Sequence, residues 1–229
     1  MRRKLSTLHL LTLVAALLPL LAIVSACKEN EDIDPAYTHY RYDIVTYMGG
    51  DNGGATYVYW GRDDSAAVTL RSSQAVDKLK PYQRVLLRYN YADDNDGASQ
   101  RQVNVYGIST IVSDSVRYTT KPIDEYNRLA IKLRSVWRTG EYINLHCQAQ
   151  YTEHPRHFYM IVDSTTWHND TVDCYLIHDV HNDTTYYWTE AYASFNMGAL
   201  WKRESCRAIR FYINDLTWPD TDHRLFIKP

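Results

Sequence analysis

The chain has 229 residues, of which 45% are hydrophobic and 23% are charged, and its 25 basic residues nearly balance its 27 acidic ones. This composition predicts a folded globular protein and excludes an extensively disordered chain. The slightly acidic balance also argues against a nucleic-acid partner, because sequence-independent binding to phosphates needs a surplus of Lys and Arg.

Residues 1–26 have the layout of a secretory signal peptide. Three basic residues at positions 2–4 precede an apolar stretch over residues 8–24, and small residues lead up to Cys27, which is the order found in exported proteins. Val24-Ser25-Ala26-Cys27 is typical of a lipobox, in which the cysteine becomes the new N-terminus and its sulfur receives a diacylglycerol. We therefore predict cleavage before Cys27, lipid attachment at Cys27 and a membrane anchor through that lipid. The alternative is an uncleaved transmembrane helix, because the apolar stretch is nearly long enough to span a bilayer.

Cleavage at this point would remove the first 26 of the 229 residues and leave 203. The signal carries three of the 25 basic residues and none of the 27 acidic ones, so the mature chain has a formal net charge of −5 with histidine neutral. Residues 27–38 are interpreted as an acidic linker. The remainder suffices for one large β domain or two small ones.

Alternation of apolar and polar residues with a period of two begins at Tyr40 and predicts strands. Ser73–Lys80 is the one segment with helical character, and Pro81 stops it. Five strands with a short helix between the third and the fourth indicate a five-stranded OB-like barrel over residues 39–117. The predicted strands are Tyr40–Met48, Tyr57–Gly61, Ala66–Arg71, Arg84–Ala92 and Gln102–Val112.

Lys121-Pro122 marks the expected boundary of a second domain, over residues 122–229. Short alternating segments separated by turn signals predict a β-sandwich there, and Phe195–Lys202 is expected to form a brief helical or looped crossover. The fold class is therefore all-β, an OB-like barrel followed by a β-sandwich. The predicted strands of the second domain are Arg128–Trp137, Tyr142–Tyr151, His157–Asp163, Thr171–Asp179, Thr185–Phe195, Cys206–Asp215 and His223–Lys228.

Three cysteines remain besides Cys27, namely Cys147, Cys174 and Cys206. An odd number in an oxidising compartment leaves at least one free thiol. Cys147 follows the apolar alternation of its strand and is expected to face the core. One disulfide among the three is possible, but sequence alone does not select the pair.

Two histidine pairs, His154 with His157 and His178 with His181, have the spacing i, i+3. On a strand this spacing places the two imidazoles on opposite faces, so neither pair is expected to chelate a metal ion. Asp93–Gly97 has acidic residues beside a glycine but lacks the first and the closing ligand of a calcium loop. We therefore predict no metal site.

The sequence has no nucleophile elbow and no phosphate-binding loop. We accordingly assign no catalytic or cofactor-binding residue, and we expect no cofactor and no enzymatic activity.

Aromatic residues gather in the first domain, at Tyr57, Tyr59, Trp60, Tyr89 and Tyr91. Barrels of the OB type bind oligosaccharides or oligonucleotides by stacking on such rings. Because alternation must send some of the rings inwards, packing in the barrel core is the favoured interpretation and ligand stacking the alternative.

Several segments outside the signal carry a family resemblance: Gln83-Arg84-Val85, Val103–Ile108 leading to Ile111-Val112, Trp137 followed by Gly140–Leu145, and Ala193-Ser194-Phe195. Together with the lipobox at Cys27, they resemble the NigD-like lipoproteins of Bacteroidetes, which pair an N-terminal OB domain with a C-terminal β-sandwich. The resemblance covers nearly all of the mature chain and rests on diffuse patterns. The family takes its name from a bacteriocin-associated gene cluster, which implies a role near toxin production or immunity, and it supplies no catalytic residues.

Two further patterns resemble signals of the same bacteria. Lys28–Asp32 is similar to the acidic stretch that follows the lipidated cysteine of surface-exposed lipoproteins, and an ordinary solvated linker is the alternative. Five Asp-Ser/Thr segments resemble a short O-glycosylation motif, with ordinary turn chemistry as the alternative. The candidate attachment residues are Ser65, Ser115, Ser164, Thr171 and Thr184.

The sequence thus predicts an outer-membrane lipoprotein, facing the cell surface or the periplasm, that binds a partner without catalysis. The partner would be a secreted or envelope protein or a glycan. The rival hypothesis is a hydrolase of an extracellular glycan or peptide, which a pocket with two carboxylates or with Ser beside His would favour. A structural envelope component with a flat apolar interface is a third possibility.

Overall fold

The computed structural model describes residues 40–51, 53–61, 66–92, 97–154, 157–218 and 222–228. The chain divides into two units, residues 1–40 and 41–229, and the description below concerns the second. The predicted signal peptide, Cys27 and the acidic linker lie outside the described residues. Within the described part of the chain, no helix has the length and apolarity needed to cross a membrane.

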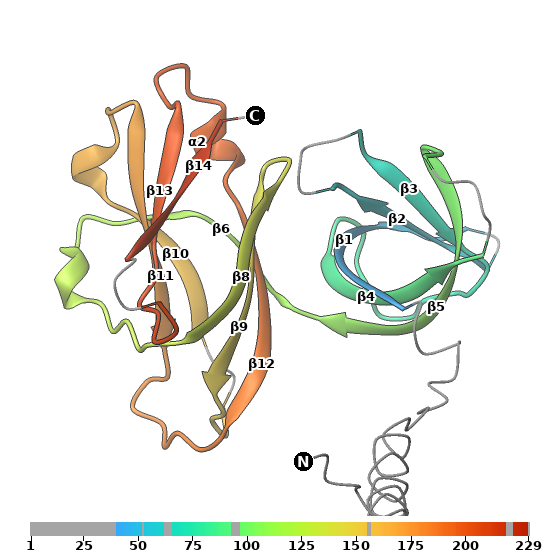
Figure 1. The fold of residues 1–229 in the computed structure, drawn as a ribbon, viewed down its shortest axis with the longest axis horizontal. Coiled ribbons are helices and arrows are strands. Elements are labelled where there is room, and N and C mark those ends of the chain that lie inside the picture. Colours follow the sequence, from blue (N-terminus) through green and yellow to red (C-terminus); the bar gives the residue numbers. More distant parts are fainter. Residues whose placement is uncertain are drawn as a thin grey trace, which may run out of the picture. The chain divides into compact units, whose positions relative to one another are not determined.

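The N-terminal part is a closed five-stranded barrel, as predicted (Figure 1). The strands run in the order β1-β2-β3-β5-β4, and β4 pairs with β1 to close the barrel. All pairs are antiparallel except β3 with β5. The strands are β1 (Arg41–Gly49), β2 (Ala55–Tyr59), β3 (Val68–Ser72), β4 (Arg84–Tyr91) and β5 (Gln100–Thr110).

Alternation determines which side chains fill the barrel. On β4, Val85, Leu87 and Tyr89 are fully buried, and Tyr57 of β2 joins them in the same apolar cluster. Two of the five aromatic residues singled out in this domain are therefore core residues, which confirms the packing interpretation for Tyr57 and Tyr89.

Replacing Tyr57 by phenylalanine is expected to raise the free energy of unfolding by about 1 kcal/mol. The Tyr57 hydroxyl is buried and has no hydrogen-bond partner among the described residues, so removing it relieves a desolvation cost. Burial also raises the pKa of Tyr57 to about 12. The unfolded chain ionises first, so this residue makes the native protein lose stability as pH rises from about 10 to about 12.

Urea unfolding at neutral pH and near pH 11 checks both parts of the prediction. The Tyr57→Phe variant should be the more stable protein at both values, and its advantage should grow with pH. A loss of stability at neutral pH would contradict it.

The predicted helix over Ser73–Lys80 is wrong, because the segment forms bends. Lys78 adopts a φ of 73°, in the left-handed region that interrupts an α-helix. Val76 and Leu79 pack against the barrel core, so burial of these two side chains, and not helical hydrogen bonding, determines the path of the segment.

The C-terminal part is a β-sandwich, as predicted. One sheet has the strand order β14-β13-β11-β10-β7 and the other has the order β6-β12-β9-β8. The strands are β6 (Val112–Ser115), β7 (Arg117–Tyr118), β8 (Lys132–Thr139), β9 (Tyr142–Gln150), β10 (His157–Val162), β11 (Thr171–Asp179), β12 (Trp188–Asn196), β13 (Ala208–Tyr212) and β14 (His223–Ile227).

Three short helical turns complete the sandwich: η2 (Ile123–Glu125), η3 (Ser164–Thr166) and α2 (Gly198–Trp201). Helix α2 lies within Phe195–Lys202, the segment expected to form a brief crossover. Leu200 and Trp201 of this helix are buried in the apolar core of the sandwich.

The change from barrel to sandwich falls earlier in the chain than Lys121-Pro122. Strand β5 ends at Thr110, and β6 begins at Val112 and pairs with β12 of the sandwich. Strand β7, also before the proline, pairs with β10. A change of pairing partner within an extended segment needs no turn residues, so the sequence pattern over Gln102–Val112 reads as one strand.

A buried arginine connects the two parts. Arg84 of β4 is 1% exposed; its guanidinium donates hydrogen bonds to Thr46 of β1 (3.0 Å), Ser194 of β12 (3.1 Å) and Asn144 of β9 (2.9 Å). It also lies 4.4 Å from the ring centroid of Tyr142. Every one of these partners is neutral, and burial lowers the pKa of Arg84 to about 10.

The three cysteines of the sandwich, Cys147, Cys174 and Cys206, are buried, and none of them forms a disulfide within the described part of the chain. Burial raises the pKa of both the Cys174 and the Cys206 thiols, which slows their reaction because the thiolate is the nucleophile.

We therefore expect none of these three thiols to react with an aromatic disulfide reagent in the native protein, and all three to react in denaturant. Lipidated Cys27 contributes no thiol. A chain that has not been processed is therefore recognised by four reactive thiols in denaturant. A denatured count of one in the mature protein would instead reveal a disulfide.

Candidate functional site

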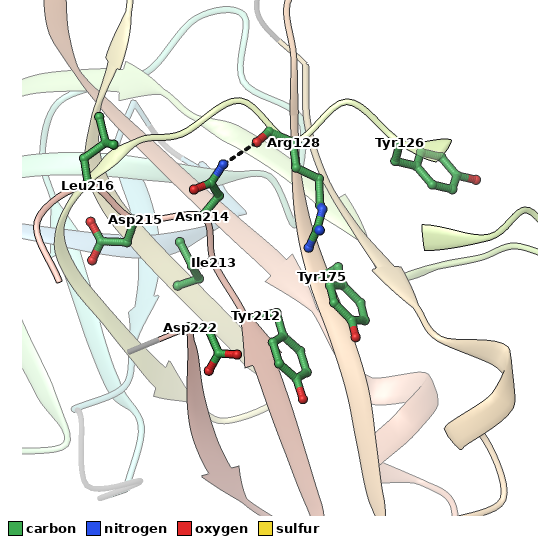
Figure 2. A pocket seen from close by; sticks show the side chains of 9 residues that line it. All are labelled: Tyr126, Arg128, Tyr175, Tyr212, Ile213, Asn214, Asp215, Leu216 and Asp222. Carbon is green, nitrogen blue, oxygen red and sulfur yellow. Dashed lines mark hydrogen bonds between the residues drawn. The ribbon is translucent and has the colours of Figure 1, made fainter. Parts of the chain in front are cut away.

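A groove of about 760 Å³ lies on the sandwich, at the end of β13 and beside β11. Figure 2 shows the side chains that line it, with two tyrosines next to each other on adjacent strands and an arginine above them. The lining residues are Tyr126, Arg128, Tyr175, Tyr212, Ile213, Asn214, Asp215, Leu216 and Asp222.

Strand alternation turns the two tyrosines away from the core. Cys174 and Leu176 of β11 and Phe211 of β13 are buried between the sheets, so Tyr175 and Tyr212 point to the opposite face. The parallel pairing of β11 with β13 places Tyr175 directly beside Tyr212. Their rings stack with centroids 4.6 Å apart and planes 8° from parallel, so each ring covers one face of the other and the pair forms a single aromatic unit.

Arg128 lies over one ring of this pair, with its guanidinium carbon 5.4 Å from the centroid of the Tyr175 ring. The backbone around it is held to the strand end, because Asn214 donates a side-chain hydrogen bond of 2.7 Å to the Arg128 carbonyl, drawn in Figure 2. Ile131 adds backbone hydrogen bonds with Asn214 and Leu216. The arginine thus extends from an anchored segment.

A charged pair borders the tyrosines. Arg210 of β13 contacts Asp173 of β11 at 3.1 Å and donates to the Tyr212 hydroxyl at 3.5 Å. Burial raises the pKa of Asp173 although Arg210 opposes this, and the pKa of Arg210 is raised by Tyr212 and Asp173. The pKa of Tyr175 is also raised, first by burial and then by Tyr212. Tyr175 therefore presents a neutral hydroxyl group near neutral pH.

Tyrosine and arginine side chains continue from the groove towards β10. The ring of Tyr126 lies 6.5 Å from that of Tyr159, and Arg117 of β7 lies 4.6 Å from the centroid of Tyr159. We call Tyr126, Tyr159, Tyr175, Tyr212, Arg117 and Arg128 the Tyr/Arg face. Its chemistry is that of a contact surface, with rings to stack and cationic groups to donate.

The groove also holds two carboxylates, Asp215 and Asp222. Asp215 is buried, and its Oδ1 accepts hydrogen bonds from the backbone N–H groups of Leu133 (3.0 Å) and Thr217 (2.8 Å). Asp222 has a side chain 75% exposed and contacts His223 at 2.6 Å. One carboxylate therefore joins two segments of backbone and the other is solvated, which differs from the shared acid–base site of a hydrolase.

The four histidines considered as metal ligands have other roles. His178 is buried and stacks on Phe158 at 4.6 Å, while His181 contacts Asp179 at 3.3 Å and lies edge-on to His157 at 4.5 Å. His154 pairs with Asp183. No group of three or more His, Cys, Asp or Glu side chains in the described ranges is arranged to hold a metal ion.

Of the candidate glycosylation residues, Ser115, Ser164 and Thr184 are exposed and Thr171 is half-buried. Ser65, like Cys27, lies outside the described residues. Access at three positions satisfies what a bulky sugar needs, and the modification itself stays a prediction.

The barrel aromatics divide between core and surface. Besides the buried Tyr57 and Tyr89, Tyr91 packs against the core and carries the Arg101 guanidinium 3.6 Å from its ring centroid. Tyr59 and Trp60 line a second, smaller cavity. Sequence reasoning offered ligand stacking as an alternative for all five of these rings and gave no indication of Tyr175 and Tyr212.

Comparison with known proteins relates the sandwich to one family. Residues 114–218 match the model of the NigD-like C-terminal beta sandwich domain, and no curated protein matches the chain.

Solved structures from Bacteroides species share the fold over most of this chain. A protein of unknown function from Bacteroides vulgatus aligns with a TM-score of 0.64 and 11% identity, covering 82% of this chain and 89% of its own. A NigD-like immunity protein from Bacteroides caccae aligns with a TM-score of 0.56 and 20% identity, covering 81% of this chain and 91% of its own. A candidate lipoprotein from Bacteroides fragilis aligns with a TM-score of 0.58 and 9% identity, covering 83% of this chain and 98% of its own. These likenesses establish the fold.

Proposed function

Because this chain carries the NigD-like C-terminal β-sandwich and belongs to that family through it, we propose that it is an exported binding protein of the cell envelope. In this proposal a lipid on Cys27 anchors it to the outer membrane. Its Tyr/Arg face holds a polypeptide partner. The NigD-like relatives suggest a non-enzymatic role.

The observation that carries the proposal is the stacked pair Tyr175–Tyr212 beside Arg128. Tyrosine and arginine are the side chains most enriched at the energetic centres of protein interfaces. Stacking fixes both rings before binding, so little side-chain entropy is lost when a partner covers them.

The class of partner follows from the same composition. Neutral hydroxyls, guanidinium groups and aromatic faces in one groove match a polypeptide segment with carbonyl and carboxylate groups. One structural relative is described as an immunity protein, and on that basis we propose a secreted, bacteriocin-like polypeptide. A glycan is the competing partner and is separated from it by the test below.

The proposed localisation rests on the lipobox and on Lys28–Asp32, and the second of these favours the cell surface. Detergent partitioning should place the native protein with lipid, and Cys27→Ala should move it to the aqueous phase. Protease treatment of intact cells should then remove it. Partitioning unaffected by Cys27→Ala would overturn the anchor, and protection from protease would place the partner in the periplasm.

The binding role is tested with a photo-crosslinking amino acid at Leu216, a groove residue that is 54% exposed. On intact cells we expect one covalent polypeptide adduct, absent when the crosslinker is placed instead at Tyr106, on β5 of the barrel. Once the partner is purified, Tyr175→Ala or Tyr212→Ala should weaken its binding about thirtyfold or more.

Two outcomes would overturn the polypeptide partner. One is the absence of any adduct at Leu216. The other is binding of this face to an immobilised saccharide panel that Tyr212→Ala abolishes, which would assign a glycan to the groove. Tyr106→Ala is the matched control, because it removes an exposed tyrosine outside the groove.

A further inference from the structure

A second cavity, of about 380 Å³, lies between barrel strand β1 and sandwich strands β8, β9 and β12. We propose that it binds the ring of a neutral pyranose sugar, independently of the Tyr/Arg face. Its size falls within the range of small-molecule sites, about 300–1,000 Å³. Besides His146, five tyrosine and tryptophan side chains line it, namely Tyr42, Tyr59, Trp60, Trp137 and Tyr192.

One wall of the cavity is formed by two stacked rings. His146 of β9 and Tyr192 of β12 occupy opposite positions in the register and stack with centroids 4.2 Å apart and planes 7° from parallel. His146 also contacts Glu190 at 2.7 Å, which holds the imidazole in place. The outer face of a ring held in such a stack suits the C–H face of a pyranose ring.

The cavity also offers groups that hydrogen-bond to hydroxyls. Asp43 of β1 is oriented by two contacts to the same oxygen, because Tyr89 donates to Oδ2 at 2.9 Å and Arg41 at 3.3 Å. Among the described residues, no hydrogen bond is directed at its Oδ1, and we assign this oxygen to a sugar hydroxyl group. Ser135 and Thr139 add hydroxyl groups to the lining.

This set of groups distinguishes a neutral sugar from other small ligands. An anionic ligand would be repelled by the Asp43 carboxylate. A quaternary ammonium ion is held by aromatic faces and one negative charge, and it has no group that hydrogen-bonds to Ser135 or Thr139. A sugar has a face for the rings and hydroxyl groups for each of these polar side chains.

The two sides of the cavity are joined by the buried arginine. Thr139, a lining residue of β8, accepts a hydrogen bond of 2.8 Å from Asn144, and Asn144 accepts one of 2.9 Å from Arg84 of the barrel. The cavity is thus formed before any ligand arrives, as small-molecule sites usually are.

Saturation-transfer NMR on the mature protein tests the proposal, with the methyl glycosides of glucose, galactose, mannose and N-acetylglucosamine as probes. We expect transfer to at least one glycoside. Asp43→Asn, which keeps the shape of the side chain, should weaken binding about tenfold, and Trp60→Ala should abolish it.

The control is Trp218→Ala, which removes a tryptophan that is 60% exposed and is not part of the cavity lining; it should bind like the unaltered protein. Three results would overturn the proposal: no transfer from any of the four glycosides, transfer unchanged in both cavity variants, or transfer from tetramethylammonium in place of the sugars. Because Tyr212→Ala should leave glycoside binding intact, failure here is distinguishable from failure of the Tyr/Arg face.

Discussion

Replacing Arg84 by alanine is expected to lower the free energy of unfolding by about 3 kcal/mol. The truncation removes three hydrogen bonds from a charged donor and leaves an empty volume beside Asn144 and Ser194. The pKa of Arg84 stays near 10, above neutral pH, so the side chain is charged in both the folded and the unfolded chain there. The loss should therefore be independent of pH between about 6 and 8.

Arg84→Met is the matched variant, because it fills most of the same space without charge. The desolvation cost of a guanidinium among neutral partners offsets much of what its hydrogen bonds contribute. We expect Arg84→Met to fall within about 1 kcal/mol of the unaltered protein in urea unfolding followed by tryptophan fluorescence. If the free energy of unfolding falls as far in the methionine variant as in the alanine variant, the charged hydrogen bonds of Arg84 make a net contribution to stability.

The second large effect is expected at Phe195. This ring is fully buried on β12, in the core between the two sheets. Truncation to alanine removes apolar contacts and leaves a cavity that close-packed neighbours fill only in part, at a cost of about 3–5 kcal/mol.

Phe226→Ala provides the comparison for Phe195→Ala, since Phe226 is only partly buried against the same core. Phe226→Ala should lower the free energy of unfolding by about half as much as Phe195→Ala or less, measured by the same urea unfolding. Equal losses for the two variants would mean that the core around Phe195 collapses to fill the space.

Much of the fold could be predicted from the sequence, because alternation reports directly which face of a strand is buried. Thr171–Asp179 was predicted with the bounds that β11 has, and Tyr142–Tyr151 differs from β9 by one residue. Ser73–Lys80 was predicted wrongly as a helix because its polar residues suit a helix, whereas the barrel needs Val76 and Leu79 as core contacts.

The groove could not be predicted by the same reasoning. Alternation turns Tyr175 and Tyr212 outwards, yet many exposed tyrosines have that property. They form a site because β11 pairs in parallel with β13. The strand between these two in the sequence, β12, belongs to the other sheet. No local pattern records such a pairing, and the position of Arg128 depends on it through Asn214.

The passage from β5 to β6 through Ile111 alone has a mechanical consequence. If the chain is tethered at its N-terminal end and a bound partner pulls on the sandwich, tension passes from the barrel into β6 and into the hydrogen bonds of Arg84. That strand pairs with β12 in parallel over residues 112–115, so a pull along its axis loads the hydrogen bonds of the pair together, in shear, and does not open them one after another. A protein held at a surface by one end would thereby keep its sandwich folded under load.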